Sequence, residues 1–332
     1  MDESDDGTIG VELTPEMPVR SVADLAVRAE EVGFDTVFVS AHYNNRDPFL
    51  ALSRVASATE SVRLGPGVVN PYETHPVSLA SNVATLDELA DGRAVFGIGA
   101  GDPSTLANLG IERERPLRRV LETVRVSKRL WRGERVDHDG TFTAVDAGLN
   151  YEVGPIPAYV GGQGPHMIRM AAKHADGVLV NASHPDDFAW AAEQVETGLA
   201  DRPDDHGPFD FAAFASVSVA ADADAAREAA RPPVAFVTAG AAPPVLDRHG
   251  IDHDRAEAVG DAITAGEFST AFDAVTPAMI DAFCVAGTPD TVAERIEAVL
   301  DYADSFVAGS PLGPDREAAI EMLGSVFDRV RA

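Results

Sequence analysis

The feature that most limits the possible folds is a repeated alternation of short apolar runs with longer amphipathic segments. Each apolar run suits a strand buried on both faces, as in parallel sheets. The amphipathic segments have helical spacing, and the first of them ends at Gly33. The expected strands cover residues 9–13, 36–39, 62–69, 94–99, 156–160, 177–180, 211–219 and 305–307. The expected helices cover residues 21–33, 76–90, 113–131, 165–174, 186–199, 289–302 and 315–330.

Eight strand–helix units in 332 residues predict an α/β fold of the (β/α)8 TIM-barrel type, forming a single domain over residues 1–332. A doubly wound parallel sheet is the alternative. Two stretches exceed a simple barrel. Residues 134–145 are typical of a β-hairpin with His138, Asp139 and Gly140 at its turn, and residues 231–283 are typical of a helical insertion. We find no Ser/Gly-rich linker and no other internal repeat.

The chain is strongly acidic, with 54 acidic and 26 basic residues and a net charge of −28. The only lysines are Lys128 and Lys173. Such self-repulsion destabilises a fold at low salt, and concentrated salt screens it. We therefore expect a halophilic protein, with an ordinary acidic protein as the alternative. The sign of the charge argues against nucleic acid as a partner.

The cysteine, histidine and apolar residues indicate which metal sites and which cellular location to expect. Cys284 is the only cysteine, so no intrachain disulfide and no cysteine-based metal site are expected. The histidines lack metal-ligand spacing, so we expect no metal. The first residues, MDESDDGTIG, lack the pattern of a secretory signal, and no apolar run approaches membrane-spanning length. These observations favour a cytoplasmic protein without a membrane partner.

Polar residues at strand ends are the candidate catalytic groups, because barrel enzymes act at the carboxyl ends of their strands. Glu12 lies inside an apolar strand. Its carboxyl group either pairs with an arginine or keeps its proton and can donate it near neutral pH. His42 follows the second strand. It could hydrogen-bond a ligand or transfer a proton. The alternative is that it caps the loop or packs on Tyr43.

Glycine-rich loops follow two of the strands. Gly161, Gly162, Gln163 and Gly164 precede a helix, and N–H groups in such a place bind phosphate. The same run is also ordinary turn chemistry. The stretch GAGD at residues 99–102 contains GxG without the rest of a dinucleotide fingerprint.

The stretch LGPGVVNPYETHP, residues 64–76, reads as a strand interrupted by glycines and a proline. Together with other motifs it resembles the bacterial luciferase-like family of flavin- or deazaflavin-dependent barrels. Within that family, the resemblance is to the branch of coenzyme F420-dependent methylenetetrahydromethanopterin reductases. It extends nearly end to end through GVELTPE (10–16), AHYNNRDPF (41–49), ATLDELADGRAVFGIGAGD (84–102), YVGGQGP (159–165), AGTPDTVAERI (286–296) and GSPLGPD (309–315).

The resemblance implies that F420 lies at the carboxyl ends of the strands. One face of its ring would rest on a bulge with a non-proline cis peptide, here Gly67–Val68. The loop after the fifth strand and the start of the next unit would hold the phosphate, and Gly101 and Asp102 would line the exit of the tail. The implied cofactor contacts are Ala41, Gly67, Val68, Val69, Asn70, Gly101, Asp102, Gly161, Gly162, Gln163, Gly177 and Val178.

The implied reaction is reversible hydride transfer that reduces a 5,10-methylene-tetrahydropterin to its 5-methyl form in one-carbon metabolism. Glu12 would be the general acid, and His42 the second catalytic residue. Relatives commonly carry aspartate where this chain has Ala41, and Glu73 or Asp47 could compensate. The pterin could be methanopterin or folate. The resemblance also implies a homodimer or a larger homo-oligomer.

Two other functions are compatible with the same motifs. One is a different luciferase-like oxidoreductase that uses F420, or FMN as the alternative cofactor, on an alcohol, a sugar phosphate or an aldehyde. The other is a non-catalytic cofactor-binding barrel, which the change at Ala41 brings into consideration. The presence of both Glu12 and His42 favours an enzyme over the binding barrel.

Overall fold

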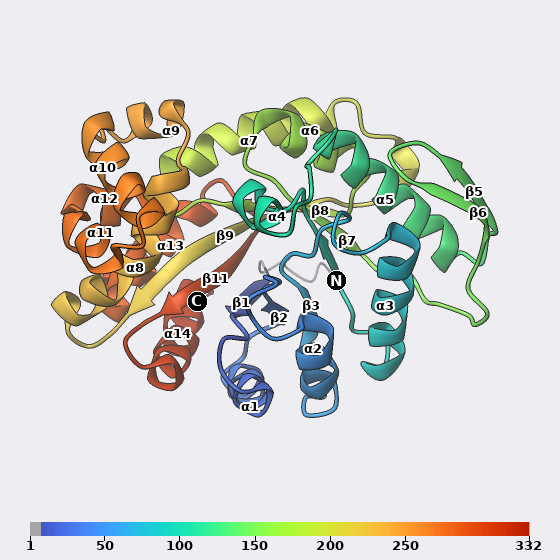
Figure 1. Ribbon diagram of the computed structural model, residues 1–332. Helices are drawn as coiled ribbons and strands as arrows, with labels where there is room; N and C mark the ends of the chain where they lie inside the picture. Colours follow the sequence, from blue (N-terminus) through green and yellow to red (C-terminus); the bar gives the residue numbers. More distant parts are fainter. Residues whose placement is uncertain (1–7, 332) are drawn as a thin grey trace. The chain divides into compact units, whose positions relative to one another are not determined.

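The computed structural model describes residues 8–331, in which strands and helices alternate along the chain (Figure 1). The acidic residues 1–7 and Ala332 lie outside the described residues, so the interpretation of the N-terminus stays a prediction. The described chain divides into two compact units. The larger comprises residues 8–180 and 190–212, and the smaller comprises residues 181–189 and 213–331.

Parallel strands form the core of the larger unit. β1 pairs with β2 and β2 with β3, with Glu12 opposite Phe38. Two isolated bridges link the β3 segment to the β4 segment, and β4, β7 and β8 pair in that order. The elements in chain order are β1 (Ile9–Leu13), α1 (Val19–Glu31), β2 (Thr36–Val39), α2 (Pro48–Ala56), β3 (Arg63–Pro66), α3 (Pro76–Leu89), β4 (Phe96–Ile98), α4 (Pro103–Asn108), α5 (Pro116–Trp131), β5 (Val136–Asp139), β6 (Thr143–Ala147), β7 (Ala158–Gly161), α6 (Pro165–His174), β8 (Gly177–Asn181) and α7 (Pro185–Leu199).

The smaller unit contains a run of helices over residues 223–283, which begins earlier than the helical insertion expected at residues 231–283. Its helices pack around an apolar cluster that includes Val234, Val259 and Met279. Strand β10, which pairs in parallel with β9, was not expected from the sequence. The elements are β9 (Asp210–Val219), whose first residues belong to the larger unit, then α8 (Ala223–Gly240), α9 (Pro243–Arg248), α10 (His253–Thr264), α11 (Phe268–Ala274), α12 (Pro277–Phe283), β10 (Val285–Gly287), α13 (Pro289–Leu300), β11 (Ser305–Leu312) and α14 (Arg316–Val330).

The expected β-hairpin is present: β5 and β6 pair antiparallel and lie against α5 (Figure 1). Its turn needs correction, because His138 and Asp139 belong to β5 and pair with Ala144 and Thr143, so of the three expected turn residues only Gly140 lies outside the strands. Two other expectations about strand ends need correction. β3 ends at Pro66, and strand pairing resumes only at Val69, because Gly67 and Val68 form a bulge between them. β11 continues to Leu312, five residues beyond the expected end of the last strand at residue 307.

Helix–strand packing in the larger unit follows the apolar pattern of the sequence. Phe96 of β4 is fully buried, and its ring meets the Trp131 ring edge-to-face with centroids 5.6 Å apart. The Trp131 indole N–H donates to the Ala80 carbonyl oxygen at 2.9 Å, so a buried hydrogen bond joins α5 to α3. Burying a large aromatic ring with its one polar atom satisfied stabilises such a contact.

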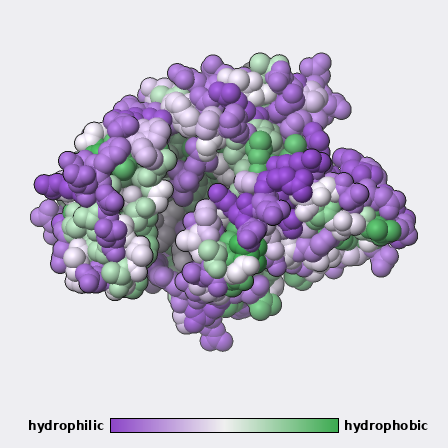
Figure 2. All heavy atoms as spheres, turned by 45° about the horizontal axis from the view of Figure 1, so that its top comes forward, coloured by the Kyte–Doolittle hydropathy of each residue, from purple (hydrophilic) through white to green (hydrophobic). Residues whose placement is uncertain are grey.

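The surface reflects the composition of the chain. The face drawn in Figure 2 is mostly hydrophilic, with smaller apolar areas between the polar side chains. Among the described residues, no helix combines the length and the apolar character needed to cross a bilayer. Within the same residues, no three histidine, cysteine or acidic side chains converge as metal ligands would.

Candidate active site

The bulge after β3 is the centre of the candidate site. The peptide bond between Gly67 and Val68 is cis, which confirms the expectation for this bond. Gly99 and Gly161, at the ends of β4 and β7, make room for the Val68 side chain, because a Cβ atom on them would lie 2.7 and 3.2 Å from a Val68 methyl group. Gly97, inside β4, makes room for the Pro66 carbonyl oxygen, which would lie 1.9 Å from a Cβ atom there. Glycine is therefore found where the Val68 side chain packs closely against the ends of β4 and β7.

A pocket of about 230 Å³ lies beside the bulge, between the loops that follow β2 and β3. Four of the expected site residues line it: Ala41, His42, Val69 and Asn70. The structure thus brings together residues that are almost thirty positions apart in the chain. Asp47 and Glu73, the two residues that we expected could compensate for Ala41, also line it. The rest of the wall was not identified from the sequence as a site, and consists of Tyr43, Asn45, Pro48, Phe49, Thr74, Leu79 and Asn82.

Asn70 fixes the shape of the β3–α3 loop, which we define as residues 70–75. Its Oδ1 atom accepts hydrogen bonds from the backbone N–H groups of Tyr72 and Glu73, both at 3.1 Å. Its Nδ2 atom donates to Glu73 Oε1 at 2.5 Å. This local turn is the type that asparagine favours. Asn70 therefore positions its own loop in addition to lining the pocket.

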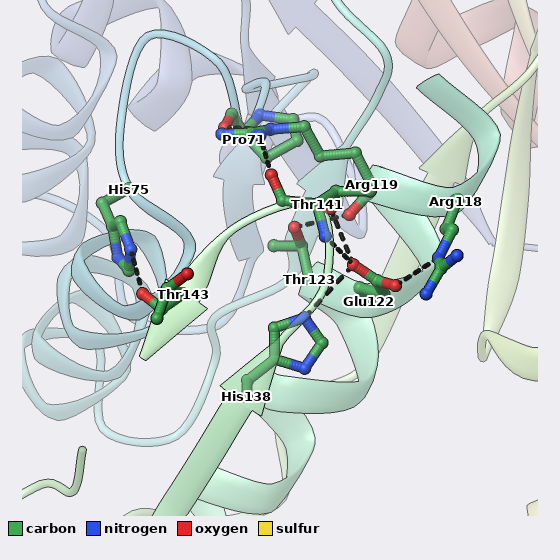
Figure 3. Close-up of polar contacts among 9 residues, drawn as sticks. All are labelled: Pro71, His75, Arg118, Arg119, Glu122, Thr123, His138, Thr141 and Thr143. Carbon is green, nitrogen blue, oxygen red and sulfur yellow. Dashed lines mark hydrogen bonds and ion pairs between the residues drawn. The ribbon is translucent and has the colours of Figure 1, made fainter. Parts of the chain in front are cut away.

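Arg119 of α5 connects the β3–α3 loop to the hairpin (Figure 3). Its Nε donates to the Pro71 carbonyl oxygen at 2.9 Å, and its Nη1 donates to the Thr141 carbonyl oxygen at 2.5 Å. The guanidinium carbon also lies 4.7 Å from the centre of the Tyr72 ring. A planar cation suits this combination of two carbonyl acceptors and one aromatic face.

Glu122, one helical turn from Arg118, holds the hairpin on α5 (Figure 3). Its carboxylate accepts from the Thr141 backbone N–H and hydroxyl, both at 2.7 Å, and from Arg118 Nε at 2.6 Å. His138 Nε2 lies 3.1 Å from the same carboxylate. Burial alone would raise the pKa of Glu122, but hydrogen bonds from Thr141, Arg118 and His138 outweigh burial and lower it to about 2.

A third contact joins the hairpin to the far end of the loop. His75, the N-cap residue of α3, has its Nε2 atom 3.1 Å from the Thr143 carbonyl oxygen in β6 (Figure 3). The hairpin is therefore linked to both ends of the β3–α3 loop, to Pro71 through Arg119 and to His75 directly.

Glu12 is the buried carboxyl group of β1, with 5% of its surface exposed. The Thr14 hydroxyl donates to its Oε1 atom at 3.0 Å. Glu12 stands opposite Phe38 in the parallel β1–β2 ladder, so the two side chains share one face of the sheet. Its assignment as general acid stays a prediction, as does the assignment of His42, whose exposed side chain lines the pocket.

The glycine loop after β7 leads directly into α6. Gly164 is the N-cap residue of this helix and offers no side-chain hydrogen bond to its first turn. The Gly162 N–H donates to the Leu179 carbonyl oxygen at 3.0 Å, which fixes the start of the loop, and Gln163 is exposed. A helix that begins without a capping side chain offers N–H groups to an anion.

Gly101 and Asp102 lie in the loop after β4. Gly101 has φ +73°, and a Cβ atom there would lie 3.2 Å from Asn70 Cγ, so the structure brings these two predicted residues together. Asp102 caps α4 by accepting from the Thr105 N–H at 2.8 Å and from the Ser104 hydroxyl. Burial opposes the ionised form of Asp102, yet these hydrogen bonds lower its pKa.

Gly177 and Val178 are not brought to the same end of the sheet. Both lie in the first half of β8, where Gly177 pairs with Tyr159 and Gly161 pairs with Leu179. Val178 is fully buried, and a Cβ atom on Gly177 would lie 2.4 Å from the Tyr159 ring. The glycine at 177 serves strand packing in this structure, and contact of these two residues with a cofactor has no geometric support.

Comparisons with known proteins agree over nearly the whole chain. The sequence profile of the family described as luciferase-like monooxygenase matches residues 5–307. The 5,10-methylenetetrahydromethanopterin reductase of Archaeoglobus fulgidus is 43% identical over 321 residues, which cover 95% of this chain and 97% of that protein. The reductase of the same name from Methanolobus tindarius is 41% identical over 320 residues, which cover 96% and 98% of the two chains.

A solved structure gives the fold. The coenzyme F420-dependent tetrahydromethanopterin reductase from Methanopyrus kandleri superposes with a TM-score of 0.90 at 38% identity, covering 96% of this chain and 97% of that chain. This match confirms the expected α/β class and TIM-barrel type of fold, and the doubly wound alternative is excluded. Since the family profile spans most of the sequence, the chain belongs to the luciferase-like monooxygenase family.

Proposed function

We propose that this protein catalyses reversible hydride transfer between reduced coenzyme F420 and a 5,10-methylene-tetrahydropterin, yielding the 5-methyl form. The observation that carries the proposal is identity of 38–43% with three 5,10-methylenetetrahydromethanopterin reductases over at least 95% of this chain. The enzyme is thus an F420-dependent oxidoreductase of one-carbon metabolism. Either methanopterin or folate can carry the one-carbon unit in this proposal.

The residues present fit F420, which combines a flat ring with a phosphate-bearing tail. At the bulge, Gly67 and Gly99 let the backbone pack closely against Phe38 and Val68, because a Cβ at either glycine would lie within 3 Å of those side chains. The uncapped start of α6 at Gly164 supplies N–H groups suited to a phosphate. Gly161, Gly162 and Gln163 would hold that phosphate, and Val68, Val69 and Asn70 would hold the ring. Bound F420 supplies the hydride.

Glu12 has the environment of a proton donor in this proposal. Reducing the methylene carbon opens the five-membered ring of the substrate, and the departing nitrogen needs a proton. A buried carboxyl group held by Thr14 at 3.0 Å can supply one from a fixed position. His42 faces the pocket from the loop after β2 and would orient the ring system there.

Spectrophotometric turnover tests the proposal. Oxidation of reduced F420 is followed in molar KCl with methylene-tetrahydromethanopterin, with methylene-tetrahydrofolate, and with alcohol, sugar phosphate or aldehyde substrates. We expect oxidation with a tetrahydropterin only. Oxidation with another substrate class alone would identify a different F420-dependent oxidoreductase. Tight binding of F420 without turnover would identify a binding protein, and binding of FMN in its place would reject the cofactor.

Substitution of Glu12 tests its role. Glu12→Gln should lower kcat by about two to four orders of magnitude, which is the usual size of a general-acid contribution. Its affinity for F420 should stay that of the wild type. Glu16→Gln is the matched control, because Glu16 is an exposed carboxylate just beyond the same strand. Near-wild-type kcat in Glu12→Gln would remove Glu12 from the mechanism.

We also propose a cytoplasmic, halophilic, single-domain enzyme that forms at least a homodimer. The acidic composition, 54 acidic against 26 basic residues, supports the halophilic part. Light scattering in molar KCl measures the oligomeric state, and a monomeric mass at working concentrations would reject the dimer.

A further inference from the structure

The Ser40 hydroxyl is a buried polar group without a hydrogen-bond partner among residues 8–331. Ser40 directly follows β2 and has 8% of its surface exposed. Its backbone N–H donates to the Leu13 carbonyl oxygen at 3.4 Å, so the ladder between β1 and β2 reaches this residue. Buried hydroxyl groups in native proteins are nearly always paired, and an unpaired one destabilises the fold.

The position of Ser40 places it next to the candidate site. Glu12 and Phe38 are register partners and share one face of the sheet. Ser40 is two residues beyond Phe38, so strand alternation puts its side chain on the face of Glu12, further toward the carboxyl end. Ser40 is not itself among the residues that line the pocket, but the next two residues, Ala41 and His42, are. An unpaired donor therefore stands where the strand meets the proposed ligand site.

The neighbouring hydroxyl group at this edge behaves differently. Thr14 is two residues beyond Glu12 on the adjacent strand, and its hydroxyl is paired with the Glu12 carboxylate at 3.0 Å. Alanine at position 40 would fill the same space without leaving a buried donor unpaired. Serine at this position is explained if its partner arrives with the ligand.

We propose that Ser40 Oγ donates a hydrogen bond to a ring carbonyl or ring nitrogen of the bound ligand. The inference rests on the proposed function, in which both F420 and the tetrahydropterin present such acceptors. Ser40 is then a ligand-binding residue whose hydroxyl is satisfied only in the complex. It contributes to affinity and lowers the stability of the free protein.

Ser40→Ala tests the inference, with Ser127→Ala as the matched control. Ser127 in α5 is fully buried, and its hydroxyl also lacks a hydrogen-bond partner among the described residues, but none of its neighbours in the chain lines the pocket. Removing either hydroxyl should leave the melting temperature of the free protein unchanged or raised. Only Ser40→Ala should weaken ligand binding, by about tenfold, the effect of losing one hydrogen bond.

Two binding measurements identify the acceptor. A rise in the dissociation constant of F420, from fluorescence titration in molar KCl, would place the bond on the cofactor. A rise in KM for the tetrahydropterin alone would place it on the substrate. Wild-type values for both constants in Ser40→Ala would overturn the inference, and this is the outcome if the hydroxyl binds only water.

The melting temperature and the titration of the wild type complete the test. A lowered melting temperature of free Ser40→Ala would show a structural hydroxyl and also overturn the inference. Wild-type protein that binds no F420 would refute the proposed function and the inference with it. Wild-type protein that binds F420, together with an unaffected Ser40→Ala variant, would refute the inference alone.

Discussion

Replacing Arg119 with alanine should loosen the β3–α3 loop, because this guanidinium joins the loop to the hairpin. The substitution removes two hydrogen bonds from a charged donor, to the carbonyl oxygens of Pro71 at 2.9 Å and of Thr141 at 2.5 Å. It also removes the contact with the Tyr72 ring. Arg119 is half-buried, so we take the low end of the usual values and expect a loss of about 3 kcal/mol in the free energy of unfolding.

Arg118 is the matched control on the same helix. It is the preceding residue and has the same side chain, but it contacts Glu122 and not the loop. Its side chain is 60% exposed, and Glu122 keeps its two bonds from Thr141 when Arg118 is removed. Arg118→Ala should therefore cost about 1 kcal/mol or less.

Two assays in molar KCl check this prediction. Urea unfolding gives the free energies, and fluorescence titration gives the dissociation constant of F420. Pro71 lies next to Asn70, which lines the pocket, so Arg119→Ala should also weaken F420 binding. If ~1.4 kcal/mol of the lost free energy is needed to hold the loop in its binding conformation, the dissociation constant of F420 rises about tenfold. Equal unfolding energies and equal F420 affinities for the two variants would refute the role of the hairpin as a support for the loop.

Two other perturbations follow from the electrostatics. Glu122 has a pKa of about 2 in the folded protein and an ordinary value of 4.5 when exposed, so its contribution is complete above about pH 5 and is lost as the pH falls toward 2. The difference in unfolding free energy between wild type and Glu122→Gln should be about 3 kcal/mol at pH 7 and should shrink below pH 5; a difference independent of pH would contradict this. Because the chain carries a net charge of −28, its melting temperature should rise between about 0.1 and 3 M KCl. Over this range the screening length falls from about 10 Å to below 3 Å. A melting temperature that does not change with salt would indicate an ordinary acidic protein.

The sequence predicts those parts of the fold that depend on local pattern. Helix α6 spans Pro165–His174 as expected, because proline marks its start and its apolar spacing is regular. The hairpin is also local, since its turn residues and strands are adjacent in the chain. The cis bond at Gly67 came from family resemblance, and no property of the local sequence alone predicts it.

The missed features depend on contacts between distant segments. Arg119 binds Pro71 and Thr141, which are 48 and 22 residues away, so its role has no local signature. Helix α2 was missed although Asp47 caps it and Pro48 begins it, because it is short and follows the polar loop after β2. The glycine at 177 looked like a ligand contact, but a Cβ there would meet the Tyr159 ring. Glycine in a strand can serve ligand approach or packing, and only the neighbouring side chains distinguish the two roles.

The structure also shows which carboxyl groups lie near Ala41, where relatives commonly carry aspartate. Asp47 and Glu73 line the same pocket as Ala41, so carboxyl groups are present there without an aspartate at 41. Asp47 accepts from the Leu50 N–H at 2.9 Å and caps α2. Glu73 accepts from Asn70 Nδ2 at 2.5 Å, so its position depends on the β3–α3 loop. The hairpin that supports this loop therefore also supports the pocket carboxylate carried by Glu73, which links the accessory hairpin to the chemistry of the site.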